Sequence, residues 1–370
     1  LASASMAGGV TSSIDAAGGE LIVVSGFGFY DGFNYTCRFT QGEAVMEMPA
    51  EQISATIVQC MTPIWGAANP PGAVDLSIVL DHSGVPVPAD EAGDCLGFSC
   101  QLMFSSSWHA LSPGSGGAGG GQSLTVTGYG FDAGAEYLVR FEGTLPSGEA
   151  ASVDSARAVP TSTTEIVLSS PAWRYAAIET TVSLYVVTSG TEQLVTGATQ
   201  LYQQLSAWVS MSVSTGPAKG GIDVVLSGYG FDSNASATAY SCEMQEGDRN
   251  ASVSGTVLSD DSLLCPLVWP FSQPDSAAQI SVRLRSGLVP LDSSADASAG
   301  AFLFVEGWDS LSPSSGPGGG GGVVTVHGYG FGYRASGSQD ASSGEYICHF
   351  VRGSESNATV GELVSVGELH

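Results

Sequence analysis

A four-residue motif recurs along this chain at an almost constant spacing. Gly-Tyr-Gly-Phe stands at residues 128–131, 228–231 and 328–331, and a Gly-Phe-Gly-Phe variant stands at residues 26–29. The steps between the copies are 128 − 26 = 102, 228 − 128 = 100 and 328 − 228 = 100 residues. A tryptophan keeps the same step, at Trp108, Trp208 and Trp308. Repetition at this period predicts one domain-sized module copied in series.

The 370 residues hold three such modules and part of a fourth. The predicted modules are residues 1–106, 107–206, 207–306 and 307–370. We expect the first module to be truncated at its start, because no tryptophan matching Trp108 precedes the first motif. We expect the fourth to lack its C-terminal part, so that the chain is a stretch of a longer protein.

Apolar residues alternate with other residues ahead of each motif, which is the pattern of a strand with one buried face. These positions are Ile22 and Val24, Leu124 and Val126, Val224 and Leu226. Further short alternating segments follow, separated by Gly, Pro and Asp. The pattern predicts an all-β fold of sandwich domains. The glycine runs near residues 119–121 and 318–322 are interpreted as turns, because a phosphate loop needs a following helix and a nearby lysine.

The charge of the chain excludes several classes of partner. It has 36 acidic and 10 basic residues, a net charge of −26, and only one lysine, Lys219. Such a chain repels nucleic acid and anionic membrane surfaces. We therefore expect no nucleic-acid partner and no membrane contact within this stretch. Solubility explains the acidity most simply. Calcium binding is the alternative, although no Asp-x-Asp-x-Asp-Gly loop is present.

Two pairs of cysteines share one separation. Cys37 and Cys60 are 60 − 37 = 23 residues apart, and Cys242 and Cys265 are 265 − 242 = 23 apart. Equal spacing in two modules predicts one disulfide in each. The second module has apolar residues at both positions, Val139 and Leu168. Joint loss of both cysteines is what a disulfide predicts, because apolar side chains of similar bulk can keep the core filled.

The other three cysteines fit this scheme less directly. The same spacing from Cys348 leads to position 371, so its expected partner lies beyond the chain end. Cys95 lies in an extra loop at residues 82–99 and can form a local bridge with Cys100, the residue directly after that loop. Zinc is the competing interpretation, but the spacing is loose and no histidine is placed with these cysteines. We expect no metal and no cofactor.

Four sequons for N-linked glycans agree with an oxidising compartment. They begin at Asn34, Asn234, Asn250 and Asn357. Each tripeptide alone is a weak signal, but all four fall near the ends of predicted strands, where a sugar can point outward. Together with the paired cysteines, they predict an extracellular or cell-surface glycoprotein.

The order of motifs in each module resembles the IPT/TIG domain. The fourth module has Ser-Pro at residues 312–313, a glycine run, an alternating strand, Gly-Tyr-Gly-Phe and then Tyr-x-Cys-x-Phe, while Cys-x-x-Pro appears at Cys60. This family, found in plexins and other receptors, implies an immunoglobulin-like β-sandwich. The first module lacks the Ser-Pro opening, the second lacks the cysteines, and the third has Ser-Val-Ser-Thr-Gly at residues 212–216. The resemblance implies fold more than function.

We expect no enzyme activity. No Ser-His-Asp order recurs among the modules, and acidic pairs such as Asp260 and Asp261 stand in turn-like segments without apolar surroundings. We expect Trp108, Trp208 and Trp308 to pack at the module junctions, with sugar stacking as the alternative.

Two hypotheses about function follow. The first is a non-catalytic structural protein, a glycosylated rod in a homo- or hetero-polymeric surface coat, cell wall or mastigoneme-like flagellar hair. The second is a receptor or adhesin ectodomain that binds a protein or glycan. Its candidate binding loop has Asp90, Glu91, Asp94 and Phe98.

Overall fold

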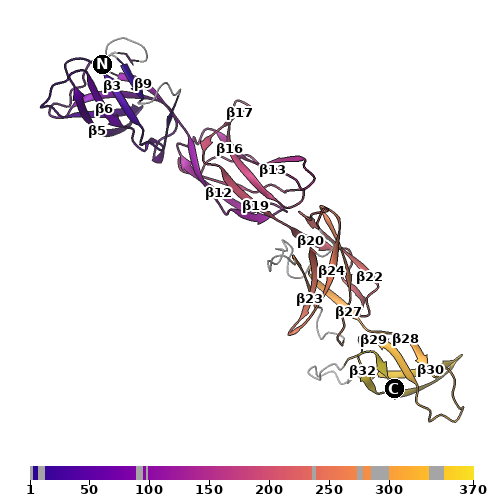
Figure 1. The fold of residues 1–370 in the computed structure, drawn as a ribbon. Coiled ribbons are helices and arrows are strands. Elements are labelled where there is room, and N and C mark those ends of the chain that lie inside the picture. Colours follow the sequence, from indigo (N-terminus) through magenta and orange to yellow (C-terminus); the bar gives the residue numbers. More distant parts are fainter. Residues whose placement is uncertain are drawn as a thin grey trace.

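The computed structural model describes residues 3–6, 13–88, 95–96, 99–235, 239–272, 278–284, 300–332 and 346–370. Within these residues the regular secondary structure is β-strand, except for the 3-10 helical turn η1 at Trp65–Ala67. Figure 1 shows the strands in four groups that follow one another in chain order. We call them unit 1 (β1–β9), unit 2 (β10–β19), unit 3 (β20–β27) and unit 4 (β28–β33). The predicted all-β fold is confirmed.

Unit 2 has two separate sheets packed face to face. One sheet has the order β15-β12-β10-β18, and the other β11-β19-β16-β13-β14 with β17 beside β16. The first strand is split, so that β10 belongs to one sheet while β11 pairs in parallel with the last strand, β19. This topology is that of an immunoglobulin-like sandwich. The strands are β10 Ser107–Ser112, β11 Ser115–Gly117, β12 Ser123–Tyr129, β13 Glu136–Thr144, β14 Ala150–Asp154, β15 Glu165–Ser169, β16 Glu179–Thr188, β17 Thr191–Leu194, β18 Thr196–Gly197 and β19 Gln200–Leu205.

Units 1 and 3 join the two layers through one long strand. In unit 1, β5 pairs with both β4 and β6, and in unit 3, β24 pairs with both β23 and β25. Each of these strands has 11 residues, whereas β14 has 5 and pairs with β13 alone among the described residues. The strands are β1 Ser3–Met6, β2 Ile14–Asp15, β3 Leu21–Ser25, β4 Tyr35–Gln41, β5 Ala44–Ser54, β6 Ile57–Met61, β7 Gly72–Leu80, β8 Cys95–Leu96 and β9 Ser99–Ser105, then β20 Ala207–Met211, β21 Thr215–Pro217, β22 Ile222–Tyr229, β23 Tyr240–Glu246, β24 Arg249–Ser259, β25 Ser262–Leu267, β26 Ala278–Leu284 and β27 Ala301–Val305.

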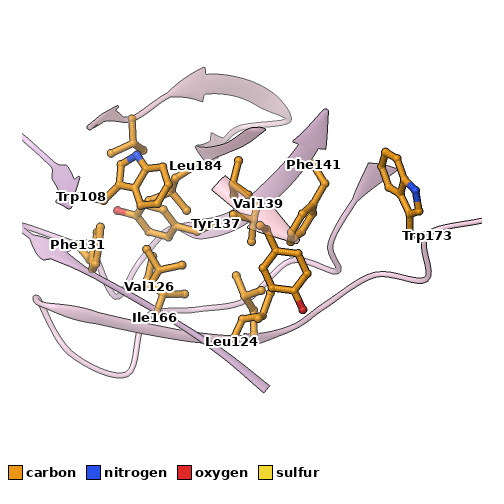
Figure 2. Packing of buried hydrophobic residues seen from close by; sticks show 14 of the residues in the cluster. Trp108, Leu124, Val126, Phe131, Tyr137, Val139, Phe141, Ile166, Trp173 and Leu184 are labelled. Carbon is orange, nitrogen blue, oxygen red and sulfur yellow. The ribbon is translucent and has the colours of Figure 1, made fainter. Parts of the chain in front are cut away.

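Each of units 1 to 3 has its own hydrophobic core, built from the alternating residues that the sequence indicates. Figure 2 shows the core of unit 2, where Leu124 and Val126 face Val139 and Phe141 across the two layers. Two of the predicted disulfides are present, Cys37–Cys60 and Cys242–Cys265. In unit 2 the corresponding Val139 and Leu168 are both buried, so apolar packing takes the place of the bond.

Unit 4 exposes residues that the other units bury. Its strands are β28 Gly307–Ser312, β29 Thr325–Tyr329, β30 Tyr346–Arg352, β31 Glu355–Gly361, β32 Leu363–Ser365 and β33 Glu368–Leu369. Among the described residues β30 pairs only with β31, whereas β4, β13 and β23 each have a partner on both sides. Phe350 is therefore 54% exposed, although Phe39 and Phe141 at the matching places are buried.

The prediction that the three spaced tryptophans pack at module junctions is wrong. Trp108 and Trp208 belong to the hydrophobic cores of their own units. The parallel pairing of β10 with β18 sets Trp108 opposite Gly197, where the absence of a side chain leaves room for the indole ring. Trp308 is 62% exposed.

Candidate functional site

The Gly-Tyr-Gly-Phe motif lies where one unit meets the unit before it. Its tyrosine packs against the core of the preceding unit: Tyr129 against unit 1, Tyr229 against unit 2 and Tyr329 against unit 3. We call these three contacts joints 1, 2 and 3. The structure thus brings together residues whose spacing alone had indicated only a repeated fold.

The phenylalanine of the motif has a different task, because it anchors the motif in its own unit. Phe131 is buried and meets Tyr137 edge to face, with ring centroids 5.5 Å apart. The Tyr137 hydroxyl oxygen accepts a hydrogen bond from the Asp132 amide at 2.9 Å. Every unit repeats the ring pair, as Phe29–Tyr35, Phe231–Tyr240 and Phe331–Tyr346. The tyrosine of the motif is therefore presented from a fixed loop.

The second glycine of the motif makes the closest approach across joint 1. Gly130 is buried with φ +71°, and a Cβ atom there would lie 2.8 Å from the Cβ of Ala16 in unit 1. Its amide donates a hydrogen bond to the Gly66 carbonyl at 3.0 Å. Its own carbonyl accepts one from the Ser106 hydroxyl at 2.6 Å. Only glycine fits this position, because both its backbone conformation and the space around it exclude a side chain.

Two side chains add polar contacts across joint 1. The Thr163 hydroxyl donates to the Ala67 carbonyl at 3.1 Å, and the Ser107 hydroxyl donates to an Asp15 carboxylate oxygen at 2.5 Å. Ser107 lies in β10, and Thr163 lies in the turn just before β15, a strand of the same sheet. The joint is therefore held at several points and not at the tyrosine alone.

Joint 2 repeats the same chemistry. A Cβ on Gly230 would lie 3.0 Å from the Cβ of Ala118, which is buried. The Gly230 carbonyl accepts hydrogen bonds from the Ala177 amide at 3.0 Å and from the Ser206 hydroxyl at 2.7 Å. Joint 2 thus repeats the contact of joint 1, in which a buried alanine faces a buried glycine. We call the position of this alanine the seat of the joint.

Joint 3 adds a charge to this seat. A Cβ on Gly330 would lie 2.8 Å from the Cβ of Ala218. The neighbouring Lys219, the single lysine of the chain, places its Nζ 4.8 Å from the centre of the Tyr329 ring. The same Nζ lies 3.7 Å from Asp309 Oδ2, also in unit 4. A cation over an aromatic face is attractive, so Lys219 links the two units.

Sequence reasoning missed the alanines, although a signal for them was present. Ala16, Ala118 and Ala218 follow the motif's own steps, 118 − 16 = 102 and 218 − 118 = 100. Alanine is so common in this chain that its periodicity does not stand out. The sequence also gave no sign that Lys219 meets the following unit.

The predicted modification sites lie on the surface. Asn34, Asn234, Asn250 and Asn357 are all exposed. Cys348 is half-buried and forms no disulfide within the part of the chain that the structure describes.

The four named residues of the candidate binding loop lie outside the described residues. Asp90, Glu91, Asp94 and Phe98 fall in the gaps at 89–94 and 97–98. On the backbone that is described, Cys95 pairs opposite Cys100 between β8 and β9. Cys100 is disulfide-bonded.

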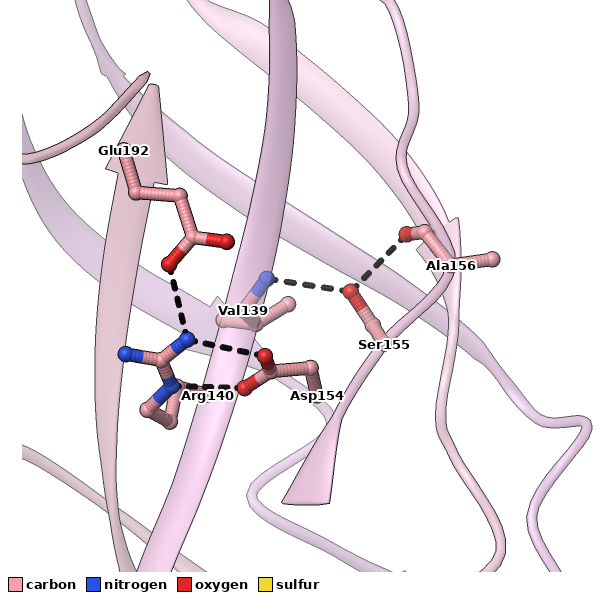
Figure 3. Close-up of polar contacts among 6 residues, drawn as sticks. All are labelled: Val139, Arg140, Asp154, Ser155, Ala156 and Glu192. Carbon is pink, nitrogen blue, oxygen red and sulfur yellow. Dashed lines mark hydrogen bonds and ion pairs between the residues drawn. The ribbon is translucent and has the colours of Figure 1, made fainter. Parts of the chain in front are cut away.

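An ion-pair cluster in unit 2 ties three strands together. Figure 3 shows Arg140 of β13 between Asp154 of β14 and Glu192 of β17. The guanidinium donates two hydrogen bonds to Asp154, at 2.6 and 2.8 Å, and one to Glu192 at 2.9 Å. The hydrogen bonds that the guanidinium donates to Asp154 are the largest cause of a raised Arg140 pKa. The cluster therefore links β13, β14 and β17 and stabilises their sheet.

No group of three or more His, Cys, Asp or Glu side chains suited to a metal ion occurs among the described residues. A search of the same residues for a helix long and apolar enough to cross a membrane found none.

The chain was compared with known proteins. No family model matches it, and the curated proteins yield no match either. Among solved structures it is similar to the plexin A4 extracellular region, at 12% identity over 81% of this chain and 33% of that chain, with a TM-score of 0.22. A second plexin A4 structure gives 12% identity over 98% of this chain and 34% of that chain, with a TM-score of 0.22. The FN1–FN3 domains of chicken CNTN1 give 12% identity over 76% of this chain and 91% of that chain, with a TM-score of 0.21.

This chain thus spans about a third of the plexin A4 region that it matches. Likeness at this level supports no statement about function. The class of the molecule, an all-β chain of immunoglobulin-like sandwich fold, follows from its own strand order.

Proposed function

We propose that this chain is a non-catalytic structural segment of an extracellular or cell-surface protein, in which the units form a stiff acidic rod. The rod belongs to a homo- or hetero-polymeric surface coat, cell wall or flagellar hair. The observation that supports this most is the repeated joint, where a buried alanine meets a buried glycine in three places. Close-packed backbone contacts leave little freedom for one unit to turn on the next.

Covalent chemistry supports the extracellular setting. Disulfides such as Cys37–Cys60 and Cys242–Cys265 form and persist in oxidising compartments. The four sequon asparagines are exposed, so N-linked glycans can be attached without disturbing a core. The net charge of −26 keeps such a chain soluble and disfavours unspecific contact with other acidic surfaces.

The test is negative-stain electron microscopy of the native, full-length protein isolated from its own cell surface. We expect regular filaments or sheets whose repeat matches a small number of units. Single flexible particles would contradict the proposal and would favour a receptor or adhesin with a protein or glycan ligand. Peptide mapping of the same material, before and after enzymatic removal of N-linked glycans, would show which of the four asparagines are modified.

A further inference from the structure

The motif of unit 1 is built like the others but faces solvent. Phe27, at the position of Tyr129, is 76% exposed, whereas Tyr129, Tyr229 and Tyr329 are all partly buried against a preceding unit. Gly28 is exposed as well, and no atom lies within 4 Å of the place where its Cβ would be, in the part of the chain that the structure describes. Its counterparts in the three joints are buried.

The rest of the unit 1 motif has the same internal contacts and backbone conformation as the motif at joint 1. Phe29 is buried and meets Tyr35 edge to face at 5.5 Å. The Tyr35 hydroxyl accepts a hydrogen bond from the Tyr30 amide at 2.9 Å, as Tyr137 does from Asp132. Gly28 has φ +76°, close to the +71° of Gly130. The loop that carries Phe27 is therefore anchored in unit 1.

We propose that Phe27 and Gly28 form a docking face for the trailing end of another sandwich unit of this class. Continuity with the three joints defines the partner's chemistry. It presents a buried alanine methyl group to Gly28, a carbonyl oxygen to the Gly28 amide and an apolar rim to the Phe27 ring, as Ala16, Gly66 and the core of unit 1 do in joint 1.

The seats inside this chain do not supply that partner. The alanines Ala16, Ala118 and Ala218 are already occupied by the glycines of joints 1, 2 and 3. The next residue in the same series is Gly318, 100 residues after Ala218, which is exposed and has no methyl group. The occupant is therefore a further unit with alanine at this place. The inference rests on the proposed function in one respect. It takes the contact seen at joints 1, 2 and 3 to be the same contact that this chain makes with a further unit.

The test joins a known seat to the open face. Residues 207–307, which include the Ala218 seat, are fused directly ahead of Leu1 of the full chain. The junction follows the observed register, because Ser3 pairs with Ser25 as Ala110 pairs with Thr127. Hydroxyl-radical footprinting with mass spectrometry then compares the oxidation rates of Phe27 and Tyr30 in the fusion and in the unfused chain. Tyr30 is 64% exposed, and Asp132 at the same place in unit 2 makes its hydrogen bonds within its own unit, so Tyr30 is the internal reference.

We expect the oxidation of Phe27 to fall about threefold or more in the fusion while that of Tyr30 stays the same. Ala218→Arg in the added copy alone should restore the original Phe27 rate, because the larger side chain blocks the seat. Unchanged Phe27 oxidation in a fusion that melts as a folded protein would overturn the proposal. If that fusion does not fold, residues 107–207, with the Ala118 seat, replace the added unit and the same comparison decides.

A second copy of this chain is the competing occupant. Phe27 protection that appears in the unfused chain as its concentration is raised would identify that occupant and would contradict the proposal. These outcomes are separate from the micrographs of native material, since a filament can form whether or not Phe27 takes part in a joint.

Discussion

The methyl group of Ala16 faces Gly130 so closely that a Cβ on the glycine would lie 2.8 Å from it. This contact joins two units and recurs as Ala118 with Gly230 and Ala218 with Gly330. In each case the alanine comes from the unit before the motif. The repeated motif thus joins neighbouring units and also ends a strand.

Gly130→Ala should destabilise joint 1 more than backbone strain alone explains. Gly148 is the matched control, because it has φ +88° with open space around it, whereas Gly130 has φ +71° against Ala16. Both alanine variants meet a left-handed strain of about 1–2 kcal/mol, and overpacking adds about 1–3 kcal/mol at Gly130 alone. Calorimetric unfolding and small-angle scattering should show a larger loss of stability and a wider spread of unit orientations for Gly130→Ala. Equal behaviour of the two variants would contradict a tight joint.

Tyr137→Phe should lower the stability of unit 2 by about 1–3 kcal/mol, because the Asp132 amide loses its acceptor. The ring stays, so the contact with Phe131 is kept. Tyr185→Phe is the control, since its ring lies under Arg140 and keeps that contact, and it should change stability by less than about 0.5 kcal/mol. Thermal unfolding measures both. A harmless Tyr137→Phe would mean that water replaces the hydroxyl.

Reduction of the disulfides should lower the stability of units 1 and 3 and leave that of unit 2 unchanged. Each of the two 23-residue disulfide loops is expected to contribute about 3 kcal/mol in units 1 and 3, while unit 2 relies on Val139 and Leu168. Calorimetry with a reducing agent should therefore lower the transitions of units 1 and 3 and leave that of unit 2 in place. The Cys242→Val, Cys265→Leu double variant copies the unit 2 solution and should lose less stability than the double alanine variant. A uniform response of all units to reduction would be the contrary result.

Alkaline pH should unfold units 2 and 3, because it ionises their buried tyrosines. Burial raises the pKa of Tyr137, Tyr202 and Tyr240 above the ordinary value of 10.0. A raised pKa means that the folded state holds the proton more tightly, so this stability is complete below pH 10 and is lost as the pH rises beyond it. Melting temperatures recorded between pH 8 and 12 should fall steeply only above pH 10. A flat profile would show that these hydroxyls ionise without unfolding.

Lys219→Met should loosen joint 3 and leave joints 1 and 2 unchanged. The lysine is about half exposed, so its ion pair with Asp309 and its contact with Tyr329 together contribute only about 0.5–1 kcal/mol. Lys219→Arg should retain most of the effect. Hydrogen exchange at the Gly330 amide, followed at low and high salt, reports the difference. Salt-independent exchange in the native chain would argue against a charged contact.

Much of the fold could be predicted because its signals are local. Alternation at Leu124 and Val126 indicated a buried strand face, and the equal spacing of Cys37–Cys60 and Cys242–Cys265 indicated two bonds that the structure contains. These patterns depend on the period of a strand and on covalent geometry. The placement of Trp108 could not be predicted in this way, because the residue that makes room for it, Gly197, is distant in sequence and joins it only through the pairing of β10 with β18.

The sequence by itself determined that this chain repeats one β-sandwich pattern, since residue periodicity is written directly along the chain. Only the tertiary structure decided what each residue of the repeat does: Phe131 anchors its own unit, while Tyr129 and Gly130 meet the unit before. The physical reason is that a contact between units depends on which surfaces the folded strands bring face to face. Ala16 and Gly130 are 114 residues apart, and no local pattern pairs them.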